Sequence, residues 1–438
     1  MLNAIQKIAN DFLKLIENKD VRIITHYDTD GIASGAIIAK ILKKLDRKFT
    51  IRIVSGLEEN ILKQELNRNE KEILFFCDLA SGSLDFFQNL KEDIFILDHH
   101  EIDSTKLNEK IRIINPHLFQ AEELCSSAIC YLFSKAILKE TSEMAKLALI
   151  GIIGDRNETP ITRIKQEILN DIKDLKIKKA PLIFSATRPI KRALEYSTAF
   201  YIPGVTGSSL GVLEILRDTG ISPDKCLEEL SEEEMSKLVT SIIIKRVGQK
   251  SPEEIIGNLY LLKFFNKKED VRELSVLVNA CSRLGQPDIA FLFCMENQKA
   301  YALAQDIYIK YRQELVSALK NAEVLEKIKG SGFIILNAKD SIKDTIIGTV
   351  TSILSSNPFY EEGTVFIGMA YNQNKIKVSA RIAGRGRNLK EVLQKSVQEM
   401  EAEVGGHQKA AGCLIKKEDE IRFIETLRRN LEIEVIKI

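Results

Sequence analysis

The sequence predicts an α/β protein with an N-terminal doubly wound parallel sheet, a helical connector and a smaller C-terminal mixed α/β domain. In the first third of the chain, short and wholly apolar runs alternate with helix-length segments, and a second alternation begins near residue 269. Apolar runs without polar alternation fit strands that are covered on both faces, as in a parallel sheet, and strand–helix–strand order is typical of doubly wound folds. Because 438 residues exceed one ordinary core, we expect domains over residues 1–185, 186–268 and 269–438.

The individual elements follow from apolar periodicity. The first 20 residues carry acids and apolar residues at helical spacing, so they predict a helix rather than a signal peptide. The N-terminal domain is predicted to contain strands Val21–Thr25, Ile51–Val54, Ile73–Cys77, Ile94–Leu97 and Ile111–Ile114, with helices over Gly31–Leu45, Glu58–Leu66 and Met144–Ile153. The connector is predicted to contain a capped helix over Ser231–Arg246. The C-terminal domain is predicted to contain helices Val271–Leu284, Ala302–Lys329 and Leu389–Val404 and strands Phe333–Asn337, Thr364–Ala370 and Lys375–Arg381.

Composition excludes several classes of protein. Lys and Arg total 63 against 62 Asp and Glu, so an overall cationic surface is excluded and nucleic-acid binding must be argued from local positions. The chain contains no uncharged apolar stretch of about 18 residues, so we expect no membrane span. Seven dispersed cysteines without a CxxC pair predict reduced thiols in the cytoplasm and argue against zinc bound by cysteine.

Acids and imidazoles follow three of the predicted strands, and a further acid ends the helix Met144–Ile153. These residues are His26, Asp28 and Asp30, then Asp78, then Asp98, His99 and His100, and finally Asp155. Because the carboxyl ends of parallel strands meet at one edge of a sheet, we expect the strand-end residues to converge there, and helix packing could bring Asp155 to the same edge. Carboxylates that converge resist joint ionisation, so the cluster predicts divalent cations.

The ligand types favour Mn²⁺, with Mg²⁺ as the alternative, because oxygen ligands are combined with imidazoles. A carboxylate can bridge two metals ~3.5–4 Å apart, and Asp78, alone at its strand end, is the natural bridge. A single strand-end aspartate is more often a helix N-cap, and a lone histidine such as His117 is usually at the surface or satisfied in the core. The combination of several acid-bearing strand ends with a His–His doublet favours the metal site.

Five short motifs resemble those of one enzyme family. His26-Tyr-Asp28-Thr-Asp30-Gly31, Asp78, Asp98-His99-His100 and Gly154-Asp155 resemble motifs I to IV of the DHH phosphoesterase superfamily, and residues 404–412 (VGGHQKAAG) resemble the GGH motif of its DHHA1 domain. Within the superfamily the match is to the RecJ-like branch, especially the archaeal RecJ or GINS-associated nuclease group. Arg272-Glu-Leu with residues 279–285 (NACSRLG) resembles the RecJ NAxGR segment, and residues 202–207 (IPGVTG) are similar to archaeal members.

The resemblance implies a role for each matching residue. It implies one metal held by His26, Asp28 and Asp78 and a second held by Asp30, Asp78, His99 and Asp155. It also implies that His100 contacts the scissile phosphate or the attacking water, that Asp98 orients the doublet, and that His407 reaches the phosphate while Gly405 and Gly406 let backbone amides approach. Arg381 matches a phosphate-clamping arginine, and Asn279 and Arg283 are further candidates for substrate contact. The chain departs from bacterial RecJ in having His26 in place of aspartate and Ser282 in place of the glycine of NAxGR.

The expected function is therefore a cytoplasmic exonuclease with two Mn²⁺ (or Mg²⁺) ions that degrades single-stranded DNA, RNA or both to 5′-mononucleotides, in DNA replication and repair or in RNA turnover. The GINS complex is a candidate partner. Two alternatives stay open. One is a nanoRNase-like enzyme that hydrolyses short oligonucleotides or cyclic dinucleotides. The other is a GINS-binding structural component of the replicative helicase.

Overall fold

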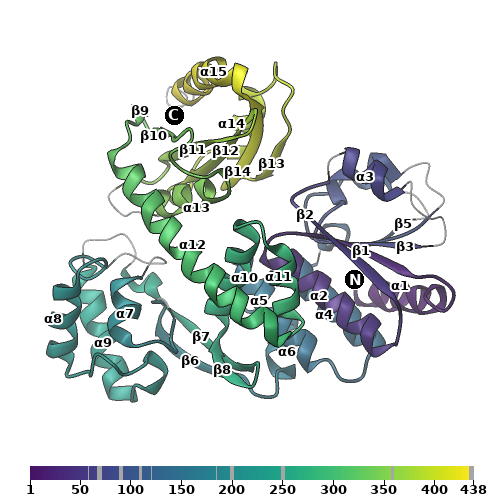
Figure 1. The fold of residues 1–438 in the computed structure, drawn as a ribbon, viewed down its shortest axis with the longest axis horizontal. Coiled ribbons are helices and arrows are strands. Elements are labelled where there is room, and N and C mark those ends of the chain that lie inside the picture. The colour runs from purple at the N-terminus through teal and green to yellow at the C-terminus, as the bar shows by residue number, and fades with distance from the viewer. Residues whose placement is uncertain are drawn as a thin grey trace. The chain divides into compact units, whose positions relative to one another are not determined.

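Two compact units make up the chain (Figure 1). The computed structural model describes residues 1–57, 59–66, 72–87, 92–107, 111–119, 121–183, 185–197, 202–247, 252–356 and 360–433. The first unit comprises Met1–Lys179 and Asn258–Tyr308, and the second comprises Ala180–Gly257 and Ile309–Ile438. The three-domain division at residues 185 and 268 stays a prediction, and residues 269–308, which it places in the C-terminal domain, pack with the first unit.

The first unit is built on a five-stranded parallel sheet. Its strands are β1 (Val21–His26), β2 (Phe49–Val54), β3 (Ile73–Cys77), β4 (Asp93–Leu97) and β5 (Ile111–Ile114), in the order β2-β1-β3-β4-β5. The five predicted strands are confirmed to within two residues. All five residues of β3 are buried, which is why this strand is apolar throughout instead of alternating.

Helices cover both faces of this sheet, which confirms the doubly wound prediction. On one face Phe12 packs edge-on against Phe75 and Phe95 of the sheet. On the other, Leu62 and Leu84 join the apolar side chains of the strands in one buried cluster. The first face carries α1 (Leu2–Leu15), α2 (Thr29–Lys44) and α4 (Ser126–Ile137), with α5 (Ser142–Gly154) packed on α2 and α4. The second face carries α3 (Glu59–Leu66) and the 3₁₀ helix η1 (Ser81–Phe87). Glu58, predicted to begin the helix that is α3, lies outside the described residues.

Further elements lie wholly or mainly in the first unit, including a three-stranded sheet of order β6-β7-β8 that the sequence analysis did not predict. The four lysine-rich residues that begin β6 are exposed, so they lack the apolar run on which strand prediction depends. The elements are η2 (Ser104–Lys106), η3 (Pro116–Leu118), α6 (Arg163–Asp171), β6 (Lys176–Pro181), β7 (Ile256–Phe264), β8 (Lys267–Asp270), α10 (Val271–Arg283), α11 (Pro287–Cys294) and the start of α12 (Gln298–Val324). Of these, α10 packs against α5, α2 and α11.

The second unit contains a six-stranded mixed sheet of order β13-β14-β12-β11-β10-β9. β10 and β11 run parallel, and α13 crosses between them, whereas the remaining neighbours are antiparallel. The strands are β9 (Ile328–Gly330), β10 (Phe333–Asn337), β11 (Val365–Asn372), β12 (Lys375–Ile382), β13 (Val404–His407) and β14 (Ala410–Lys416). The helices of this sheet are α13 (Asp344–Ser355), α14 (Leu389–Ser396), α15 (Glu420–Ile433) and the 3₁₀ helix η6 (Lys417–Asp419). α14 and α15 share a buried apolar cluster with one face, and α13 contacts β11 and β12.

The connector contributes a helical region to the second unit, as predicted. Its elements are α7 (Ile190–Glu195), α8 (Ser209–Thr219), η4 (Leu227–Glu229), α9 (Glu232–Lys245) and η5 (Pro252–Ile255). The predicted cap of α9 is confirmed, because Ser231 Oγ accepts from the Glu234 amide at 3.2 Å and the Glu234 carboxylate accepts from the Ser231 amide at 2.8 Å. Among the described residues, no helix is both long and apolar enough to span a bilayer.

Two predicted helices extend too far. The prediction of one helix over Leu389–Val404 is wrong beyond Ser396, where α14 ends, and Val404 begins β13 instead. Gly405 and Gly406 are poor helix formers, and their strand pairs with β14. The predicted helix Ala302–Lys329 is α12, which ends at Val324, and Ile328–Gly330 form the edge strand β9.

Candidate metal centre

The predicted acids and imidazoles lie at the carboxyl ends of three adjacent strands, β1, β3 and β4. Thr25, Cys77 and Leu97 are register partners across these strands, so the residues that follow them emerge at one edge. Asp28 is the N-cap of α2, where its Oδ1 accepts from the Gly31 amide at 2.9 Å. Asp155 is the C-cap of α5, which packs against α2.

One cluster joins His26, Asp28 and Asp78. His26 Nδ1 lies 3.1 Å from Asp28 Oδ2 and 3.3 Å from Asp78 Oδ2. One ligand atom from each of the three residues falls within 4.8 Å of the others. The spacing therefore suits a single cation.

A second cluster lies on the other oxygen of Asp78. Asp78 Oδ1 is 3.5 Å from His99 Nε2 and 4.0 Å from His100 Nδ1. His99 Nε2 is also 3.9 Å from Asp155 Oδ2. The structure thus places Asp78 between two sets of donor atoms, one on each carboxylate oxygen.

Asp30 is buried beneath the cluster, and its carboxylate is fixed by the N-terminus of α4. Its two oxygens accept from the amides of Ser126 at 2.7 Å and Ser127 at 3.1 Å, and Ser126 Oγ donates to Asp78 Oδ1 at 2.9 Å. The sequence analysis missed both serines. Their only signal is that they begin an apolar helix, and free amides at a helix N-terminus bind anions.

Charges in the centre are strongly perturbed. Burial, and then the neighbouring carboxylates of Asp78 and Asp155, raise the pKa of Asp30 to about 8. Burial raises the pKa of Asp155 to about 6, with the carboxylates of Asp78 and Asp28 adding to the effect and the imidazolium of His99 opposing it. Burial opposes the charged forms of His26 and His99, but the nearby carboxylates outweigh it and raise the pKa of both imidazoles well above the usual value.

These shifts provide a test of whether a cation fits. Burial alone would raise the pKa of Asp78, but hydrogen bonds from His26 and His99 hold it well below the usual range. The carboxylates thus favour positive charge beside them, and the raised pKa values of His26 and His99 indicate that protons on these imidazoles would supply part of it where no metal is bound. Carboxylate oxygens and imidazole nitrogens are donors that Mn²⁺ and Mg²⁺ accept, so divalent cations could replace those protons.

Asp98 is fully buried and holds His100 rather than facing the cluster. It accepts from the backbone amides of Ser81 at 2.9 Å and His99 at 2.8 Å, and it lies 2.7 Å from His100 Nδ1. Burial alone would raise the pKa of Asp98, but the hydrogen bond from His100 lowers it. An ionised Asp98 requires the Nδ1–H form of His100, which leaves Nε2 of this half-exposed ring available to a substrate.

Arg283 and Asn279, the candidates from the NAxGR-like segment, lie on α10 one helical turn apart, and both are half-buried. Arg283 Nη1 donates to Tyr27 Oη at 3.1 Å, and the guanidinium carbon lies 5.6 Å from the centre of the Tyr27 ring. Tyr27 stands between His26 and Asp28. The structure therefore places Arg283 beside the segment that supplies His26, Asp28 and Asp30. The sequence analysis did not identify Tyr27 as the residue that Arg283 contacts.

The remaining candidates belong to the second unit. Arg381, Ala410 and His407 are register partners across β12, β14 and β13, so Arg381 and His407 lie on the same face of that sheet. Arg381 Nε donates to Ser352 Oγ at 2.8 Å, and His407 and Gly405 are exposed. Gly406 has φ +109°, and a Cβ there would overlap the carbonyl oxygen of Ala410, so this position requires glycine.

His117 is exposed, which confirms its interpretation as a surface histidine. Its backbone amide caps the local 3₁₀ turn by donating to Asn115 Oδ1 at 3.0 Å.

Sequence models of three domains match the chain. Residues 20–152 match the N-terminal domain of the DHH family, residues 183–260 the DHH-CID domain and residues 330–432 the DHHA1 domain. The chain belongs to the DHH superfamily. Its N-terminal domain is the parallel-sheet DHH domain, its C-terminal domain is the mixed-sheet DHHA1 domain, and a helical region lies between them in the sequence.

The relatives extend this match over almost the whole length of the chain. An uncharacterized protein of Methanocaldococcus jannaschii is 28% identical over 97% of this chain and 96% of its own. The crystal structure of CDC45 from Entamoeba histolytica is similar with a TM-score of 0.71 and 12% identity, covering 98% of this chain and 99% of its own. The crystal structure of exonuclease RecJ bound to manganese is similar with a TM-score of 0.61 and 15% identity, covering 97% and 93%. The DHH-superfamily chain thus has a RecJ-like fold, and at these identities the structural similarity concerns the fold alone.

Proposed function

We propose that this protein is a metal-dependent exonuclease that hydrolyses single-stranded DNA, RNA or both to 5′-mononucleotides. The observation that carries the proposal is the placement of Asp78 between two sets of donors, His26 with Asp28 on one oxygen and His99 on the other. Two cations so placed would activate a water and neutralise a phosphoryl oxygen. In this proposal His26, Asp28 and Asp78 hold one Mn²⁺ or Mg²⁺ ion. Asp30, Asp78, His99 and Asp155 hold the other.

The protein's own groups would orient the substrate. Burial opposes the charged form of His100, but Asp98 outweighs it and raises the pKa of the imidazole, which favours the imidazolium that a phosphate attracts. Its Nδ1 proton is held by Asp98, so Nε2–H is the atom that would donate to a phosphate oxygen. We further propose that Arg283, with Asn279 beside it on α10, binds substrate.

The face of the second unit that carries Arg381, Gly405 and His407 supports a phosphate-binding role. Exposed glycine lets phosphate approach backbone amides, and a guanidinium held by Ser352 presents a fork suited to phosphate oxygens. We propose that this face contacts the same class of substrate, a nucleic-acid strand.

The experiment is a degradation assay with end-labelled single strands of DNA and RNA in the presence of Mn²⁺ or Mg²⁺. Wild type is expected to release mononucleotides, and Asp78→Asn is expected to lose activity because one amide oxygen cannot serve two cations. An Arg381→Gln variant should instead raise KM. Absence of cleavage by wild type, or equal cleavage by Asp78→Asn, would refute the nuclease. Faster hydrolysis of two-residue substrates than of twenty-residue substrates would favour the nanoRNase-like alternative.

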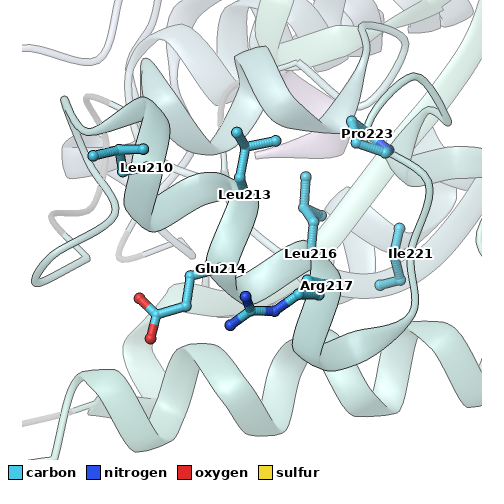
Figure 2. Close-up of a pocket in the computed structure, with 7 residues that line it drawn as sticks. All are labelled: Leu210, Leu213, Glu214, Leu216, Arg217, Ile221 and Pro223. Atoms are coloured by element: carbon cyan, nitrogen blue, oxygen red, sulfur yellow. The ribbon is translucent and has the colours of Figure 1, made fainter.

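We also propose a second role, binding of a protein partner at an exposed apolar surface, with the GINS complex as the candidate partner. The DHH-CID region exposes aliphatic side chains of α8, with Leu210 80% and Leu213 51% exposed (Figure 2). They line a pocket of about 590 Å³ together with Glu214, Leu216, Arg217, Ile221 and Pro223. Exposed apolar groups of this kind mark protein-binding surfaces. Co-purification of GINS with wild type but not with a Leu210→Glu, Leu213→Glu double variant would support this role.

A further inference from the structure

Helix α10 contacts two of the four chain segments that supply candidate ligands to the metal centre, the one that carries Asp28 and the one that carries Asp155. Arg272, in its first turn, makes a two-point ion pair with Glu158, with Nη1–Oε1 at 3.1 Å and Nη2–Oε2 at 2.7 Å. In the middle of the helix, the Ser275 carbonyl accepts from Thr29 Oγ1 at 3.2 Å. At its end, Arg283 donates to Tyr27. Glu158 follows Asp155 by three residues, whereas Tyr27 and Thr29 flank Asp28.

We propose that α10 is a clamp that fixes the distance between the two ligand-bearing segments, and that Arg272 and Glu158 are its positioning residues. This inference rests on the proposed metal centre, but it assigns a role to two residues that do not contact any atom proposed to bind metal. The clamp acts on the cation that Asp155 would hold, because Glu158 lies only three residues after Asp155, just beyond the turn that ends α5.

That turn is short and its backbone is constrained. Arg156 adopts φ +55°, and the amides of Arg156 and Asn157 donate to the carbonyls of Ile153 and Ile152 at 3.2 and 2.9 Å. Glu158 therefore follows closely on the end of α5, and a shift of its backbone would be passed to Asp155 through this hydrogen-bonded turn.

The ion pair is well suited to hold this turn. Both side chains are mostly buried, with exposed fractions of 24% for Arg272 and 21% for Glu158, and Arg272 also donates to the Asn258 carbonyl at 3.1 Å. A planar guanidinium that makes two parallel hydrogen bonds fixes direction as well as distance, which an ammonium cannot do.

Close packing links the same three helices beside the centre. A Cβ at Gly154 would lie 2.6 Å from Thr29 Cβ and 3.2 Å from Ser275 Oγ, so α5, α2 and α10 meet there without a gap. A rotation of α10 would therefore displace the start of α2 and the end of α5, where Asp28, Asp30 and Asp155 lie.

The test measures Mn²⁺ binding in the absence of substrate, by the electron paramagnetic resonance signal of free Mn²⁺, for Arg272→Gln, Glu158→Gln and the double variant. Loss of support around a metal site typically weakens affinity ~10–100-fold, so we expect a loss of about tenfold in each single variant, confined to one of two bound ions. Because the two single substitutions break the same ion pair, the double variant should bind Mn²⁺ no more weakly than either single variant.

Lys146→Gln is the matched control. Its ion pair with Asp174 spans 2.9 Å with exposed fractions of 19% and 24%, but it lies at the other end of α5. This control should lower thermal stability about as much as Arg272→Gln without changing Mn²⁺ affinity. Unchanged affinity in Arg272→Gln and Glu158→Gln, or equal losses in Lys146→Gln, would overturn the clamp while leaving the metal centre intact. Failure of wild type to bind Mn²⁺ would overturn the metal centre and the clamp together.

Discussion

Replacing Gly151 by alanine is expected to damage the metal centre, although alanine normally favours a helix. Gly151 lies in the last turn of α5, where a Cβ would overlap Ser127 Oγ and lie 2.6 Å from Asp30 Oδ1. The helical preference of alanine over glycine contributes about 1 kcal/mol of stability, whereas overpacking of a buried site costs about 1–3 kcal/mol. The net effect on the free energy of unfolding is therefore a loss of roughly 0–2 kcal/mol. Mn²⁺ affinity should fall more clearly, because the atoms that must move are a proposed ligand and the residue whose amide fixes it.

The assay compares urea unfolding without metal and Mn²⁺ binding for Gly151→Ala and Gly82→Ala. A Cβ at Gly82, in η1, would meet no atom of a more distant residue within 4 Å, so this variant should keep wild-type Mn²⁺ affinity and stability to within about 1 kcal/mol. A Gly151→Ala protein that is more stable than wild type and binds Mn²⁺ normally would refute the packing argument.

Three further outcomes follow from other contacts. Asp98→Asn keeps the shape of the side chain but turns an amide toward backbone donors, so turnover in the nuclease assay should fall about 10–100-fold; unchanged turnover would contradict the proposed orientation of His100. Glu65→Gln should cost about 3–5 kcal/mol in urea unfolding, because it removes the buried negative charge that pairs with the buried Arg22 and with Arg52 and leaves these cations only the neutral acceptors Thr50 and Gln64. Burial alone would raise the pKa of Glu65, but Arg22 and Arg52 lower it, so its stabilisation is complete above the pKa of the unfolded chain and is lost as pH falls through the lower folded value. The difference between wild type and Glu65→Gln should accordingly shrink in acid, and a constant difference would contradict the ion pair. Finally, chelation of Mn²⁺ present at 100 times its Kd should lower stability by about 2.7 kcal/mol for each proposed ion, measured by the same unfolding assay.

The N-terminal sheet could be predicted from the sequence because its strands are buried on both faces. A segment such as Ile73–Cys77 has no polar position to interrupt the apolar run, and the polar residue that ends the run also marks the edge of the sheet. The same reasoning predicted that His26, Asp78 and His99 would converge, since neighbouring parallel strands end side by side. The end of a strand and the position of a proposed metal ligand thus follow from the same sequence signal in this fold.

Other parts of the site could not be predicted, because they depend on packing between distant segments. Ser126 and Ser127 carry no charge, and their amides matter only because α4 begins beneath Asp30. Arg272 lies more than a hundred residues from Glu158, and nothing local to either residue indicates that they pair. The helix over Leu389–Val404 was predicted too long because no Gly or Pro before Gly405 marks its end, so the stop at Ser396 and the start of β13 at Val404 were missed.

Asp78 shows how backbone conformation decides between the common and the rare role of a strand-end aspartate. An aspartate at this position usually caps the next helix, but here the Ser81 amide at the start of η1 is satisfied by Asp98 at 2.9 Å. Asp78 instead adopts φ +61°, a left-handed conformation that costs a residue other than glycine roughly 1–3 kcal/mol. This backbone conformation directs one carboxylate oxygen of Asp78 toward His26 and the other toward His99. A cap would need one oxygen and an ordinary backbone. A role that uses both oxygens would account for the cost of this conformation, and holding a cation on each oxygen, as proposed above, would be such a role.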